Sequence, residues 1–160
     1  MKHLKTILLV VFVIVAVGTG FRKYWVEKAE DSRRVVNPPG IAPLVPAYSV
    51  GIRDGNMVYV SGMTGVKPGT QDIVDGGVGP QTRQTLENIR TTLVAAGATM
   101  ADVNECSVFL VDMADYAAMN AVYVEFFPVD PPARATLAVS ALPRPAARVE
   151  IKCSARTGRR

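Results

Sequence analysis

Four side chains of this 160-residue sequence have the chemistry to bind a small organic anion. Arg134 opens a strand-like segment directly after Pro-Pro-Ala, and a guanidinium can donate two parallel hydrogen bonds to a carboxylate. Asn120 is polar on the otherwise apolar face of a predicted helix, between two tyrosines at helical spacing. Glu150 is a strand carboxylate among basic neighbours, and Tyr48 begins the first predicted strand.

Each of these residues also has an ordinary structural explanation. Arg134 fits an exposed strand arginine, Glu150 a cross-strand ion pair, and Tyr48 a packed aromatic rim. Spacing alone favours those explanations for all three residues. For Asn120, two interpretations are equally good: a surface residue at the edge of the apolar face of its helix, or a functional residue.

The sequence excludes several kinds of catalytic site after the N-terminal segment. The only histidine is His3, so no Ser-His pair, Cys-His pair or histidine metal site is available. The glycines at 76–79 do not follow a strand as a phosphate-binding loop requires. We therefore expect no metal and no cofactor. Cys106 and Cys153 both fall in strand-like segments, and the sequence leaves a disulfide and two buried thiols equally open.

Periodicity predicts one α+β domain. Helices are expected where apolar residues recur at helical spacing, and strands where they alternate or run together. The predicted strands cover 48–53, 57–61, 103–111, 133–139 and 148–155, and the helices cover 80–96 and 112–127. The order is β-β-α-β-α-β-β, with two helices on one face of a mixed sheet. The strand at 103–111 is expected to be buried on both faces. Nothing in one copy would cover the other sheet face, so we expect self-association.

The N-terminal segment reads as a leader. A basic start precedes an unbroken apolar run, Ile7–Val17, so residues 1–25 are predicted to be a signal peptide or an N-terminal membrane anchor. Either alternative, a signal peptide or an anchor, predicts that the protein is exported or membrane-anchored on the extracytoplasmic (periplasmic) side. A charged, proline-rich linker is predicted over 26–46, the domain over 47–156, and a basic tail over 157–160.

The distribution of charge argues against a nucleic-acid partner. The chain carries a net charge of +4 and has a pI near 9.3. Residues 1–35 hold seven Lys and Arg against three Asp and Glu, whereas residues 36–160 hold eleven of each. The excess positive charge therefore belongs to the leader. The basic residues after position 143 are interpreted mainly as a solvated strand face and tail.

Several motifs, in order and at matching intervals, resemble the Rid (reactive intermediate deaminase, RidA-like) family over about residues 47–156. The opening hairpin, first helix, central strand, second helix and last two strands all carry the resemblance. The matching segments are 48–52, 55–62, 81–89, 108–113, 120–127, 132–134 and 149–151.

The resemblance implies a chorismate-mutase-like fold, a homotrimer with clefts between subunits, and cofactor-free hydrolysis of 2-imino or enamine acids to 2-oxo acids and ammonia. By position, Arg134 would hold the substrate carboxylate and Glu150 would orient or activate water. Tyr48 and Asn120 would line the cleft, with backbone groups around Ser61 and Gly62 adding hydrogen bonds. These last four residues are the expected substrate-binding set.

Two departures from the family pattern keep alternatives open. Met63-Thr64-Gly65 stands where the family commonly has Gln-Ile-Pro, and Ala135 replaces a frequent Ser or Thr. They motivate a non-catalytic, trimeric sensor of small carboxylates as the main alternative. The terminal basic patch motivates a third alternative, an RNA-acting protein. The neutral net charge of the domain and the predicted leader both argue against this alternative.

Overall fold

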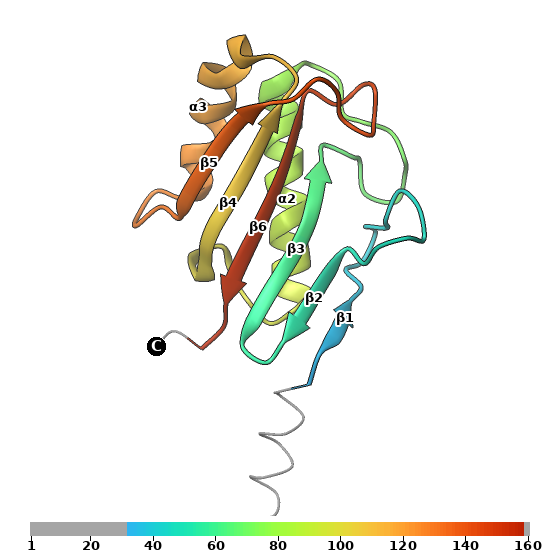
Figure 1. The fold of residues 1–160 in the computed structure, drawn as a ribbon, viewed down its shortest axis with the longest axis vertical. Coiled ribbons are helices and arrows are strands. Elements are labelled where there is room, and N and C mark those ends of the chain that lie inside the picture. Colours follow the sequence, from blue (N-terminus) through green and yellow to red (C-terminus); the bar gives the residue numbers. More distant parts are fainter. Residues whose placement is uncertain (1–31, 159–160) are drawn as a thin grey trace, which may run out of the picture. The chain divides into compact units, whose positions relative to one another are not determined.

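A mixed six-stranded sheet carries two helices on one face (Figure 1). The computed structural model describes residues 32–158, so the predicted leader over 1–25 lies outside the described residues. The strands are β1 (Arg34–Val36), β2 (Gly51–Asp54), β3 (Met57–Thr64), β4 (Val103–Leu110), β5 (Ala133–Ala138) and β6 (Val149–Arg156). The helices are α2 (Val78–Ala95) and α3 (Tyr116–Phe126), with short 3-10 turns η1 (Met100–Asp102) and η2 (Met113–Asp115). Within residues 32–158, no helix is both long and apolar enough to cross a membrane.

The strands lie in the order β1-β2-β3-β6-β4-β5. All neighbouring pairs are antiparallel except β4 and β5, which run parallel and are joined through α3. A parallel pair needs such a crossover because a short turn cannot return the chain to the start of the next strand. The α+β class and the predicted element order are confirmed, with β1 as an additional strand.

The core lies between α2 and the sheet. Leu86, Ile89 and Leu93 of α2 are fully buried, at the spacing that puts them on one helical face. In β6, alternate residues from Val149 to Ala155 are buried, as the sequence pattern predicts. The prediction that the third strand is buried on both faces is wrong for a single chain. Residues of β4 alternate between buried and more exposed, because only one face of the sheet packs on helices.

The opposite face of the sheet carries exposed apolar side chains. Tyr59 and Leu137 expose 47% and 49% of their surface there, on strands whose other face is turned toward the helices. Neither α2 nor α3 covers this face (Figure 1). The open face predicted from the sequence is therefore present in the described part of the chain.

The second helical segment begins in two steps. The carboxylate of Asp112 accepts a hydrogen bond of 2.9 Å from the backbone N–H of Ala114, which caps the 3-10 turn η2. The chain then continues directly into α3 at Tyr116. The predicted start of this segment at Asp112 is thus confirmed as a cap, with α3 proper beginning four residues later.

Part of the predicted linker over 26–46 belongs to the domain. Arg34–Val36 forms β1, which pairs antiparallel with β2, and Val36 is almost fully buried in the core. The guanidinium of Arg53, on β2, donates to the carbonyl of Ala96 at the end of α2 (2.9 Å). At the other end, Thr157 of the predicted tail donates to the carbonyl of Asn56 (2.8 Å). The domain therefore extends beyond 47–156 on both sides.

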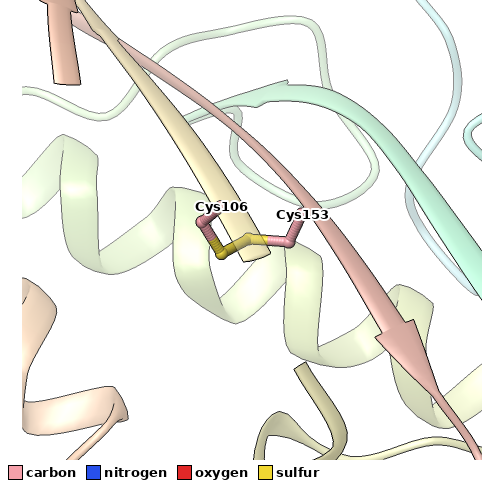
Figure 2. The surroundings of a disulfide bond; sticks show 2 residues. All are labelled: Cys106 and Cys153. Carbon is pink, nitrogen blue, oxygen red and sulfur yellow. A yellow bond between two sulfur atoms is a disulfide. The ribbon is translucent and has the colours of Figure 1, made fainter. Parts of the chain in front are cut away.

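A disulfide joins two neighbouring strands of the sheet, β4 and β6. Cys106 on β4 and Cys153 on β6 are direct register partners whose Cα atoms are 4.2 Å apart (Figure 2). Both cysteines are almost fully buried on the face that packs on the helices. The bond decides between the two alternatives that the sequence leaves open, a disulfide and two free thiols.

Replacing both cysteines by alanine should lower the free energy of unfolding. The bridge closes a loop with a sequence separation of 47, for which chain entropy predicts about 4 kcal/mol of stabilisation. Thermal unfolding with and without reductant measures this effect. The wild type should lose stability in reductant and the double variant should not. Equal midpoints for the oxidised wild type and the variant would contradict the prediction.

Candidate functional site

The guanidinium of Arg134 is held by two side chains of α3. Its Nη1 donates to Oδ1 of Asn120 (2.9 Å), and its Nη2 donates to the hydroxyl of Tyr116 (3.0 Å). Tyr116 and Asn120 lie one helical turn apart, so they present their polar atoms side by side. Two bonds from separate nitrogens fix the plane of the guanidinium as well as its position.

Aromatic rings complete the surroundings of this cation. The guanidinium carbon of Arg134 lies 4.6 Å from the ring centroid of Tyr123 and 5.7 Å from that of Tyr116. Tyr123 is buried and packs against Phe127, with ring centroids 4.8 Å apart. Burial raises the pKa of Tyr123 to about 12, a rise that the positive charge of Arg134 partly offsets. Tyr123 is therefore a neutral platform at physiological pH.

The charge of Arg134 has no carboxylate partner among residues 32–158. Asn120 and Tyr116 are both neutral acceptors. A guanidinium has five N–H donors, so three remain after these two bonds. Since the side chain of Arg134 is only half-buried, those donors can meet an anionic ligand. We call Tyr116, Asn120, Tyr123 and Arg134 the arginine group.

A second set of predicted site residues gathers around β3. Tyr48, Ser61 and Gly62 line one hollow of about 460 Å³, part of which is open to solvent. Ser61 donates its hydroxyl hydrogen bond to the carbonyl of Ser49 (2.7 Å), and the Tyr48 hydroxyl accepts from the backbone N–H of Leu44 (2.9 Å). Both hydroxyls are therefore fixed by the chain that leads into β2.

A bulge in β3 shapes this hollow. Between Val60 and Met63 the pairing with β6 advances by only two residues, so Ser61 and Gly62 fall in the irregular part of the strand. The carboxylate of Glu150 lies against Gly62 so closely that a Cβ there would be 2.0 Å from Oε1. A glycine is therefore required at position 62 for Glu150 to occupy its place. We call Tyr48, Ser61, Gly62 and Glu150 the carboxylate group.

Glu150 has the properties of a base. Desolvation by burial raises the pKa of its carboxyl above the usual value for glutamic acid. Within residues 32–158, this carboxylate makes no hydrogen bond and no ion pair. An ionised carboxylate with free lone pairs and a raised pKa can accept a proton from water.

One chain does not bring the two groups together. Arg134 is in register with Cys106, which is in register with Cys153, so the three side chains share the face that packs on the helices. Glu150 lies three positions from Cys153 in β6 and therefore points to the opposite face. All six predicted site residues thus fall into two half-sites, with Arg134 and Asn120 in one and the other four in the second.

Two residues of the arginine group carry no role in the interpretation of the sequence. Tyr116 and Tyr123 lie four residues before and three residues after Asn120, so the helical spacing places all three on one face. That helical spacing is the sequence signal that could have placed Tyr116 and Tyr123 beside Asn120. It does not by itself tell whether a tyrosine packs in the core or cradles a cation, because this depends on what the neighbouring strand presents.

The departure from the family pattern at 63–65 has a structural counterpart. Asn88, buried on α2, donates to the carbonyls of Thr64 (3.2 Å) and Val66 (2.9 Å). Gly65 packs directly on the backbone of Gln81. The altered segment is therefore tied to α2. Among residues 32–158, no cluster of three or more His, Cys, Asp or Glu side chains could hold a metal ion.

Gly62→Ala should displace the Glu150 carboxylate without unfolding the protein, because the clash falls on the end of a flexible side chain. Once displaced into solvent, Glu150 should titrate at a lower pKa, closer to the ordinary glutamic acid value. An NMR titration of the Glu150 carboxyl carbon measures this change. An unchanged pKa in the variant would show that the carboxylate does not depend on Gly62.

Gly65→Ala is the matched control. A Cβ at position 65 would lie 2.9 Å from backbone atoms of Gln81, which cannot move aside as a side chain can. This variant should lose about 2 kcal/mol of stability through overpacking. Its thermal midpoint should fall, whereas that of Gly62→Ala should stay close to the wild type.

Comparison with known proteins places this arrangement in a family. The family model described as Endoribonuclease L-PSP matches residues 41–157. A RutC family protein of Pyrococcus horikoshii is 45% identical over 102 residues, which are 64% of this chain and 80% of that protein. Reactive Intermediate Deaminase A, chloroplastic, of Arabidopsis thaliana is 35% identical over 135 residues, covering 84% of this chain and 72% of its own.

A solved structure agrees with this placement. The crystal structure of E. coli TdcF with bound serine has a TM-score of 0.69 and 32% identity, covering 78% of this chain and 99% of that one. The shared sheet topology, the matched span and these relatives lead to one conclusion. The chain belongs to the Rid family, whose family model carries the description Endoribonuclease L-PSP.

Proposed function

We propose that this protein hydrolyses 2-imino and enamine acids derived from amino acids to 2-oxo acids and ammonia, without a cofactor. The observation that carries the proposal is the state of Arg134. Its guanidinium is oriented by Asn120 and Tyr116, rests on the ring of Tyr123, and has no carboxylate partner among residues 32–158. Such a cation is suited to gripping the carboxylate of an amino-acid derivative.

The proposed site forms between copies of the chain in a homotrimer. The arginine group of one copy would face the carboxylate group of its neighbour. Two observations support this arrangement. Arg134 and Glu150 point to opposite faces of one sheet, and the face that carries Glu150 also exposes Tyr59 and Leu137. An exposed apolar face of this kind commonly marks an interface.

The proposed chemistry needs only positioning and one base. Arg134 binds the substrate carboxylate, which places C2 of the imine at the cleft. Glu150 accepts a proton from a water molecule, the water oxygen attacks C2, and the proton passes from Glu150 to the imine nitrogen to give a carbinolamine. The hydroxyl proton of the carbinolamine then passes through Glu150 to the amino nitrogen, the C2–N bond breaks to release ammonia, and the C2–O bond becomes the carbonyl of the 2-oxo acid. An enamine first takes a proton at carbon to become the imine. Holding an electrophile beside an oriented water accounts for much of the acceleration.

The relatives support the substrate class. One relative is named a reactive intermediate deaminase, and the TdcF structure contains serine, an amino acid with the carboxylate that Arg134 would bind here.

A carboxylate sensor without turnover is the second candidate. Ala135 stands where many relatives have a hydroxyl, and the segment at 63–65 differs from the family pattern. Such a module would bind 2-oxo acids through the same arginine. Measurements of turnover, and not measurements of binding, therefore distinguish the sensor from the enzyme.

Arg134→Ala should abolish most of the deaminase activity. Losing a charged, two-donor contact to the substrate is expected to lower kcat/KM about 100-fold. Arg134→Lys, which keeps the charge but not the fork, should lose nearly as much. The measurement follows the disappearance of an imino acid generated in place by an amino-acid oxidase.

Arg90→Ala is the matched control, since Arg90 is an exposed arginine on the outer side of α2. It should retain wild-type activity. A wild type that fails to accelerate imino-acid loss would refute the enzyme. If that protein still bound 2-oxo acids through Arg134, the sensor would be favoured.

A further inference from the structure

A second arginine borders the hollow that Tyr48, Ser61 and Gly62 line. Arg144, in the loop between β5 and β6, borders the same hollow as Tyr48, Ser61 and Gly62. The other lining residues are neutral, so Arg144 supplies the only formal charge among the described residues that line it. This arginine takes no part in the proposed chemistry.

Arg144 is oriented by a neutral partner. Its Nη1 donates to the backbone carbonyl of Gln71 (2.8 Å), and its Nη2 donates to the side-chain Oε1 of the same residue (2.6 Å). Within residues 32–158, no carboxylate forms an ion pair with it. Three N–H donors of a half-buried guanidinium therefore remain for an anion.

The loop that carries Arg144 is anchored. Pro143 and Pro145 flank the arginine and restrict the backbone on both sides. The buried side chain of Gln81 on α2 donates to the carbonyl of Ala146 (3.1 Å) and accepts from the backbone N–H of Arg148 (2.7 Å). A charged group on a fixed loop is pre-organised for a ligand.

Arg144 also borders a second hollow, whose other titratable residues are Lys67, Asp72 and Asp75. Asp75 pairs with Lys67 at 3.8 Å, and Asp72 is exposed. Neither carboxylate is within ion-pair distance of Arg144. The charge of Arg144 is thus unpaired on that side, and Arg144 also borders the hollow lined by Tyr48, Ser61 and Gly62.

We propose that Arg144 binds a second anionic group at the side-chain end of the ligand, so that the preferred substrates are imino acids with an acidic side chain. This inference rests on the proposed function, because it assigns one arginine to each carboxylate of the substrate. A ligand with an apolar side chain would leave Arg144 desolvated without a counter-charge, which disfavours that ligand.

Calorimetric binding of two 2-oxo acids to the full-length protein tests the inference. The probes are 2-oxoglutarate and 5-methyl-2-oxohexanoate, in which an isopropyl group replaces the second carboxylate. The wild type should bind 2-oxoglutarate at least about 10-fold more tightly, as a charged hydrogen-bonded contact predicts. Arg144→Met should remove that preference by weakening 2-oxoglutarate binding alone. Arg144→Lys should keep part of the preference, and Arg90→Met should keep all of it.

Equal affinities in the wild type, binding of neither probe, or a preference that survives in Arg144→Met would each overturn the inference. These outcomes are distinct from failure of the proposed function. Turnover of imino acids without a dicarboxylate preference would leave the deaminase standing and remove the role of Arg144. An Arg144-dependent preference in a protein without turnover would support the Arg144 site and remove the deaminase.

Discussion

Alternation of side chains along a β-strand is the constraint on which the candidate site depends. It puts Arg134 on the helix-packed face of the sheet and Glu150 on the open face. An isolated chain therefore holds two incomplete halves, a cation without a base and a base without a cation. Neither half can carry out hydrolysis of an anionic imine by the proposed route. The proposal that copies join their unlike halves follows from this geometry together with the exposed apolar side chains on the face that carries Glu150.

Each half is rigid for identifiable reasons. On one side, α3 presents Tyr116, Asn120 and Tyr123 to Arg134, and this helix starts at a fixed point because Asp112 caps the preceding turn. On the other side, the bulge in β3 lets Glu150 lie on Gly62. The disulfide ties β4 to β6, the strands that lie between β5 and β3. The disulfide therefore adds a covalent link between the strand that carries Glu150 and the strand that pairs with the one carrying Arg134.

Much of this fold could be predicted from the sequence, because apolar periodicity and glycine and proline signals report the helices and most strands. β1 could not be predicted, since three residues followed by prolines carry too short a pattern and pair only because β2 offers an edge. Asn120 and Arg134 could be proposed from residue type, but the cradle of Tyr116 and Tyr123 requires the register of β5 against β4. Glu150 lies against Gly62, in the bulge of β3, and its burial raises its pKa. No local sequence pattern predicts this bulge.

Co-expression of Arg134→Ala and Glu150→Ala subunits tests the central claim, that the site is assembled from unlike halves of two copies, most directly. Each variant alone should be inactive in the imino-acid assay. Random mixing in a ring leaves about a quarter of the interfaces with both wild-type residues, so the mixture should recover about a quarter of wild-type activity. Activity in the mixture no higher than that of either variant alone would contradict the account.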